Sequence, residues 1–138
     1  TGVQTCALPI CERIKNNKAI ILAETLDKAT EKYLQNNKSP SRVVNEPDNR
    51  TSHFYLAMYW AEALSEQTKN SELKEKFTIF AKKLKENEEK INKELIDVQG
   101  KSNDLGGYYK PDDKLASKAM RPSDTFNSII EELAYIKA

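Results

Sequence analysis

Glycine, cysteine and histidine are all scarce in this sequence. Its 138 residues include four glycines, two cysteines and one histidine. Glycine weakens helices, so its scarcity beside many Ala, Leu, Lys and Glu residues favours a helical chain. Cys6 and Cys11 lie close together without a second metal-binding pair, which excludes a zinc site or a disulfide framework built from this chain alone. Such cysteines are typical of a reducing compartment, and we predict a cytoplasmic protein.

An excess of one charge and a long apolar run are also missing. The chain carries 22 basic and 21 acidic side chains, which gives a net charge of +1. Nucleic-acid-binding proteins normally show a basic excess or stripe, so we predict no nucleic-acid partner. No apolar run approaches the length that crosses a bilayer, so we predict no membrane partner either.

The spacing of the apolar residues that are present predicts a mainly α fold. Leucine and alanine recur at helical intervals, and no β–α–β alternation or internal repeat occurs. Between the first two helices, a segment with two prolines has room for a short extended piece at 42–44. The expected helices lie around 22–33, from 49–52 to about 64, over 71–99, over 114–120 and after Ser123.

Residues 71–99 carry apolar side chains at nearly heptad spacing. This spacing fits either a coiled coil with a partner or an amphipathic helix that packs on its own domain. Asn87 interrupts the apolar series, and the pattern lasts for fewer than four heptads. We therefore predict the amphipathic helix.

Two further features carry only weak functional signals. His53 has no nearby Cys or second His, so a structural role is favoured over metal binding or general-base catalysis. Residues 106–111, "GGYYKP", have paired glycines but no known phosphate-binding pattern. The simpler interpretation is a tight turn that packs its two tyrosine rings against the helices.

Arg50 stands at the start of an expected helix, within the sequence "EPDNRTSH". A helix N-terminus offers free N–H groups and a partial positive charge, and a guanidinium can hold a phosphate bidentately. The alternative is a capped helix whose Arg50 pairs with Asp48 or Glu46. Spacing alone leaves these two interpretations equally supported.

Four stretches in order along the chain resemble the C-terminal end of monomeric-type NADP-dependent isocitrate dehydrogenases. They are "NKAIILAETLDKATEKYLQNNKSPSR", "DNRTSHFYLAMYWAEAL", "DLGGYYKPDD" and "AMRPSDTFNSII". The resemblance covers the chain from about Cys11 to the end. It implies a fragment of the α/β terminal domain of a larger two-domain enzyme, in the domain that the two chain ends form.

The resemblance also implies a function. Enzymes of this family oxidise isocitrate to 2-oxoglutarate and CO₂, reduce NADP and use Mg²⁺ or Mn²⁺. The implied enzyme is a bacterial, cytoplasmic monomer of the tricarboxylic acid cycle. Its catalytic residues and metal ligands would lie upstream, so none is expected in this fragment. Arg50 matches the arginine of the family's Asp-Asn-Arg motif, which helps to bind the 2′-phosphate of NADP.

The first ten residues, "TGVQTCALPI", contain no charged side chain and differ in composition from the rest. They resemble the translation of a sequencing-library adapter. We therefore predict that residues 1–10 are an artefact and that residues 11–138 are the C-terminal part of the enzyme domain. We expect the fragment to be inactive alone, and the alternative is a stand-alone helical module that binds a protein partner.

Overall fold

The computed structural model describes residues 16–135, which fold into helices and connecting loops without a β-strand in that range. The prediction of a mainly α chain is therefore confirmed. Both cysteines and the predicted adapter segment lie outside the described residues. The helices are α2 (Asn17–Gln35), α3 (Asn49–Glu66), α4 (Ser71–Glu86), α5 (Glu88–Asp97), α6 (Asp113–Met120) and α7 (Asp124–Tyr135).

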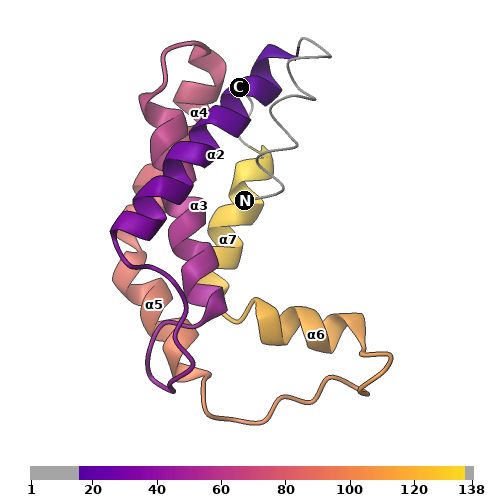
Figure 1. Ribbon diagram of the computed structural model, residues 1–138. Helices are drawn as coiled ribbons and strands as arrows, with labels where there is room; N and C mark the ends of the chain where they lie inside the picture. The colour runs from indigo at the N-terminus through magenta and orange to yellow at the C-terminus, as the bar shows by residue number, and fades with distance from the viewer. Residues whose placement is uncertain (1–15, 136–138) are drawn as a thin grey trace.

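Five of these helices form one elongated body, and α6 lies to one side of it (Figure 1). Helix α3 is central, since it packs along α2 and α4 and also contacts α5. Neighbours cover this helix on several sides, so its buried residues are not confined to one face. Its buried residues are Thr51, Ser52, Phe54, Tyr55, Met58, Tyr59, Ala61 and Leu64.

Polar contacts hold α3 against its neighbours at two positions along the helix, Trp60 and Tyr55. The Trp60 indole N–H donates to the carbonyl oxygen of Leu22 and to Thr25 Oγ1, both at 3.1 Å. The Tyr55 hydroxyl donates to Glu88 Oε1 at 2.8 Å, which joins α3 to α5. Burial, with the Glu88 carboxylate beside the ring, raises the pKa of Tyr55 to about 12, so this hydroxyl stays protonated.

The single helix predicted over 71–99 is wrong, because the chain breaks it at Asn87. The Asn87 side chain donates to the carbonyl oxygen of Lys83 at 2.9 Å and ends α4 there. Asn87 then starts α5, which ends at Asp97 rather than beside Gly100. The choice of an amphipathic helix over a coiled coil is confirmed, since Leu84 and Ile91 are fully buried in the domain's own core.

The remaining helices agree with the sequence prediction. Helices α2, α6 and α7 lie where expected, and the inward residues of α7 pack on the core. The extended piece at 42–44 is wrong, because the chain turns there and the Glu46 N–H donates to the Val43 carbonyl oxygen at 3.2 Å. Among the described residues, no helix has the length and apolar character that a membrane span requires.

Glu94 on α5 anchors the start of α7. Its carboxylate accepts hydrogen bonds from the Ser123 hydroxyl at 2.6 Å and the Thr125 hydroxyl at 2.7 Å. Ser123 Oγ in turn accepts the Phe126 N–H at 3.1 Å and so caps α7. Burial raises the pKa of Glu94, but the hydrogen bonds from Ser123 and Thr125 outweigh it, and the pKa lies below its ordinary value.

Replacing Glu94 by alanine is expected to lower the free energy of unfolding at pH 7 by about 2 kcal/mol, because charge-assisted hydrogen bonds are lost. The carboxylate stabilises the fold fully above its unfolded pKa of about 4.5, and this contribution is lost as pH falls through the lowered folded value. Urea unfolding at pH 7 and at pH 3 measures both effects. Glu131→Ala, an exposed change on α7, is the control. An equal loss for Glu94→Ala at both pH values would contradict the role of the charge.

Candidate functional site

The first turn of α3 carries the candidate site. Asp48 is the N-cap, and its Oδ1 accepts the N–H groups of Arg50 at 2.9 Å and Thr51 at 3.3 Å. Aspartate is a preferred N-cap because it satisfies N–H groups that have no partner within the helix. The predicted start of this helix is therefore confirmed, with the cap one residue before the expected range.

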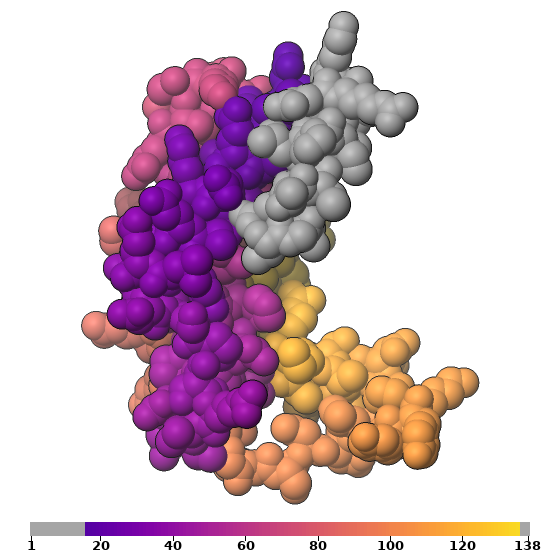
Figure 2. Space-filling model, viewed as in Figure 1, coloured from indigo at the N-terminus to yellow at the C-terminus, as the bar shows by residue number. Residues whose placement is uncertain are grey.

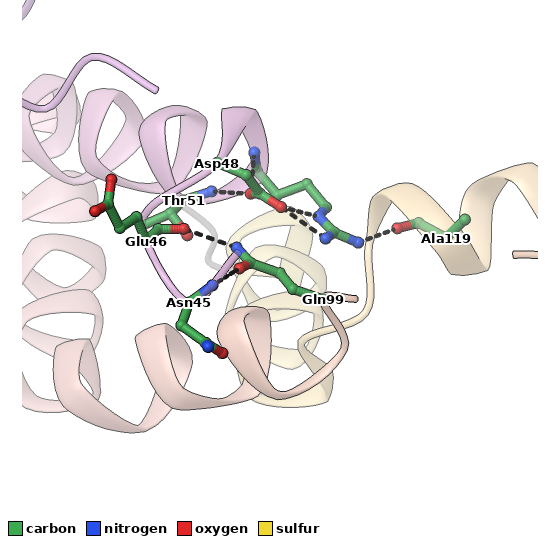
Figure 3. A network of polar contacts seen from close by, with 7 residues as sticks. Asn45, Glu46, Asp48, Thr51, Gln99 and Ala119 are labelled. Atoms are coloured by element: carbon green, nitrogen blue, oxygen red, sulfur yellow. Dashed lines mark hydrogen bonds and ion pairs between the residues drawn. The ribbon is translucent and has the colours of Figure 1, made fainter. Parts of the chain in front are cut away.

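The Arg50 guanidinium is held on two sides (Figure 3). Its Nε and Nη2 donate to Asp48 Oδ2 at 2.9 and 2.6 Å, and its Nη1 donates to the Ala119 carbonyl oxygen at 2.9 Å. The pairing with Asp48 that the sequence left open is thus formed. Glu46 instead accepts a hydrogen bond from the Ser41 hydroxyl.

Pairing with Asp48 leaves part of Arg50 able to bind an anion. A guanidinium has five N–H donors, and three of those of Arg50 are used in these bonds. The Arg50 side chain remains 15% exposed. Asp48 and Ala119 therefore orient the guanidinium and leave two N–H groups for a ligand.

The Asp48 carboxylate stays charged in this arrangement. Burial raises its pKa, but the hydrogen bonds from the Arg50 side chain and the Thr51 N–H outweigh burial and lower the pKa below its ordinary value. Part of the Arg50 charge is therefore neutralised locally, and further cations are needed for a strongly positive site.

Gln99 joins the loop before α3 to the turn after α5. Its Oε1 accepts the Asn45 N–H at 2.7 Å, and its Nε2 donates to the Glu46 carbonyl oxygen at 2.9 Å (Figure 3). Asn45 has a φ of 73°, a left-handed conformation that asparagine tolerates better than most residues. This bridge holds the turn after α5 beside Asp48 and Arg50.

Arg50 adjoins three pockets. The first, of about 240 Å³, lies between the loop before α3 and the turn after α5. The second, of about 210 Å³, lies along α3 and the start of α7 and includes His53 and Arg121. The third, of about 360 Å³, lies between α3 and α6 and is lined by Leu105, Ala116 and Met120 among others.

The first pocket has the charge that suits a phosphate. Arg42, Arg50 and Lys101 line it, with Asp48 as the acidic member of the lining. Because Asp48 is already paired with Arg50, the other two cations give the pocket its net positive character. Sequence reasoning missed Arg42 and Lys101, and no spacing signal could have found them, since they meet only through the Gln99 bridge.

The other predicted features are not gathered into this site. His53 is exposed on α3 and lines the second pocket, away from the first. Residues 106–111 lie in the loop before α6, as expected, but the packing predicted for their rings is wrong. Tyr108 is 90% exposed and Tyr109 is 97% exposed, because the loop runs outside the helical body.

Comparison with known proteins identifies the family. A family model described as monomeric isocitrate dehydrogenase matches residues 4–131. The chain belongs to this family. The match begins within the first ten residues, so the boundary at residue 11 stays a prediction.

The names of three similar proteins agree with this family assignment. Isocitrate dehydrogenase (NADP) of Azotobacter vinelandii is 58% identical over 120 residues, which cover 87% of this chain and 16% of that protein. Isocitrate dehydrogenase (NADP) 2 of Colwellia maris is 59% identical over 118 residues, or 86% of this chain and 16% of the relative. Isocitrate dehydrogenase (NADP) 2 of Mycobacterium tuberculosis is 51% identical over 116 residues, which cover 84% of this chain and 16% of that protein.

The chain thus spans about 16% of the length of these curated relatives. It is a fragment of a larger enzyme of this family, which argues against the stand-alone interaction module. Whether the fragment belongs to an α/β domain formed by both chain ends stays a prediction.

Proposed function

We propose that the full-length protein oxidatively decarboxylates isocitrate to 2-oxoglutarate and CO₂ with reduction of NADP, as a cytoplasmic monomer. Family membership and the names of the relatives support this proposal. Within the described residues, no group of three His, Cys, Asp or Glu side chains could hold a metal ion. The proposal assigns Mg²⁺ or Mn²⁺ to residues outside this fragment, as the family resemblance implies.

In this proposal, the described residues supply helical scaffold and one cofactor contact. Arg50 binds the 2′-phosphate of NADP in the first pocket, assisted by the charges of Arg42 and Lys101. The observation that carries the assignment is the oriented guanidinium at the α3 N-terminus with two N–H donors left over. NADP supplies hydride-accepting chemistry when bound, and these side chains only hold and orient it.

The same geometry would favour NADP over NAD. NAD has a hydroxyl group where NADP carries a dianionic phosphate. A planar guanidinium donates two parallel hydrogen bonds to a phosphate, and charge-assisted bonds are about twice as strong as neutral ones. Arg50 lies in the first turn of α3, where the helix N-terminus adds a partial positive charge. With NAD, these groups would gain no anionic partner.

Isocitrate-dependent absorbance of the reduced cofactor, measured on the full-length enzyme with Mg²⁺, tests the proposal. We expect strong activity with NADP and weak activity with NAD. The isolated 138-residue chain is the negative control and is expected to be inactive, because it lacks the isocitrate and metal sites. Equal use of both cofactors by the full-length enzyme would contradict the phosphate site, and activity of the isolated chain would contradict the placement of the catalytic residues.

A further inference from the structure

The loop before α3 and the turn after α5 form two walls of the first pocket. The loop brings Arg42 to the pocket, and the turn brings Lys101. Figures 1 and 2 show both segments at the same end of the molecule. They are distant in sequence, since Asn45 of the loop and Gln99 of the turn are separated by 54 residues. The pocket therefore depends on the contacts that hold these two segments together.

The loop before α3 is closed on itself by its own hydrogen bonds. The Ser41 N–H donates to the Pro47 carbonyl oxygen at 2.7 Å. The Glu46 N–H donates to the Val43 carbonyl oxygen at 3.2 Å, and Ser41 Oγ accepts the Val43 N–H at 3.1 Å. These bonds fix the shape of the loop around Arg42, but none of them reaches the turn after α5.

The Gln99 side chain makes both hydrogen bonds that join the loop to the turn within the described part of the chain. Its Oε1 accepts the Asn45 N–H and its Nε2 donates to the Glu46 carbonyl oxygen (Figure 3). A primary amide presents an acceptor and a donor in one plane, so this pair of bonds fixes both the position and the orientation of the loop. Gly100, with a φ of +72°, lets the turn pass so close that a Cβ atom there would lie 3.3 Å from Val44 Cγ1.

Electrostatic repulsion opposes this arrangement of the loop and the turn. Arg42 and Lys101 are exposed cations that line one pocket of about 240 Å³. Their charges repel when no anion lies between them. The two hydrogen bonds of Gln99 offset that repulsion and hold the cations in place before a ligand arrives. Groups that are already in place need not be ordered on binding, and this strengthens affinity.

We propose that Gln99 is a positioning residue for the selectivity of the enzyme for NADP over NAD. It holds Arg42 and Lys101 on the two walls of the pocket that receives the 2′-phosphate, and it acts on the cofactor through these two cations. The inference rests on the proposed function, because it requires the phosphate in the first pocket. NAD places no anion there, so the Gln99 bridge contributes little to the binding of NAD.

Replacing Gln99 by methionine in the full-length enzyme removes both hydrogen bonds and keeps the length of the side chain. We expect the KM for NADP to rise about 10-fold, because two exposed charge interactions with the phosphate weaken together. The kcat and the KM for NAD should stay nearly unchanged. An equal rise in the KM for both cofactors would overturn the proposal, because it would show a merely structural role.

Arg50→Ala, measured in parallel, separates failure of this proposal from failure of the proposed function. If Arg50→Ala raises the KM for NADP and Gln99→Met does not, the phosphate site stands and the role of Gln99 is overturned. If Arg50→Ala has no effect, the phosphate site itself is overturned, and the role of Gln99 with it.

Gln67, at the other end of α3, provides a matched control. Its Nε2 donates to the Asn70 carbonyl oxygen at 2.6 Å, and its Oε1 accepts the Asn70 N–H at 2.9 Å. Gln67→Met therefore removes the same two kinds of bond from a turn that does not line the first pocket. We expect the KM for NADP to rise only in Gln99→Met. An equal rise in Gln67→Met would overturn the proposal.

Double substitutions show whether Gln99 acts through the two cations. In the wild-type background, Arg42→Ala and Lys101→Ala should each raise the KM for NADP about 3-fold. In the Gln99→Met background, the same substitutions should have almost no further effect, because the cations are no longer held near the phosphate. Both cations are exposed, so their removal leaves the folded core intact. Full additivity, or no effect of either cation in the wild type, would overturn the proposal.

Discussion

Replacing Arg50 by alanine in the full-length enzyme is expected to raise the KM for NADP by about 100-fold, with little change in kcat. Two charge-assisted hydrogen bonds would be lost, at about 1.5 kcal/mol or more each, and every 1.4 kcal/mol is a factor of ten in affinity. The KM for NAD should change little, because NAD lacks the 2′-phosphate. Selectivity between the cofactors would therefore fall by nearly the same factor.

Two further variants show which property of Arg50 matters. Arg50→Lys keeps the charge but loses the planar fork, so its KM for NADP should lie between those of wild type and Arg50→Ala. Arg121→Ala removes an exposed cation from the neighbouring second pocket and should leave the KM nearly unchanged. An unchanged KM in Arg50→Ala would remove Arg50 as a ligand and leave it as a partner of Asp48 and Ala119 alone.

Replacing Phe54 by alanine should produce the largest loss of stability, about 3–5 kcal/mol in the free energy of unfolding. Phe54 is 0% exposed at the centre of the core. Its ring meets the Phe126 ring edge to face, with the centroids 5.2 Å apart, and so connects α3 to α7. The substitution leaves a cavity between these helices that the surrounding side chains cannot fill without moving.

Urea unfolding of the full-length enzyme, followed by a signal from this domain, measures that loss. Phe54→Leu keeps most of the volume and should cost less than about 1.5 kcal/mol. Ile79→Ala changes a half-exposed side chain on α4 and should stay within about 0.5 kcal/mol of wild type. A similar small effect for Phe54→Ala would mean that α7 does not close the core as described.

Local sequence signals were sufficient to predict the positions of most of the helices. Caps and apolar periodicity located α2, α3, α6 and α7 because each is bounded by Asn, Asp, Ser or Pro residues with clear local preferences. The break at Asn87 was missed because the apolar spacing continues almost undisturbed across a single capping residue. The extent of burial around α3 could not be predicted, because periodicity indicates one buried face, whereas this helix packs on several sides.

The candidate site was only partly predictable. Arg50 was found from its place in a helix start and from a resemblance in sequence. The carbonyl oxygen of Ala119 is 69 residues away in the chain and carries no side-chain signal, so only the fold reveals that it orients the guanidinium. Gln99 was likewise invisible, since its two hydrogen bonds are to backbone groups of the loop before α3.

The long excursion between α5 and α7 also has a consequence for the order of folding. Helices α2, α3 and α4 are consecutive in sequence and pack on one another, so their contacts require only short loop closures. Helix α7 contacts α4 and α5 only after residues 98–123 have formed the loop that separates α5 from α7. Closing a longer loop costs more entropy and non-local contacts form more slowly. The α2–α4 unit should therefore assemble first, and residues 98–123 should become fixed at both ends only in the last step, when α7 packs.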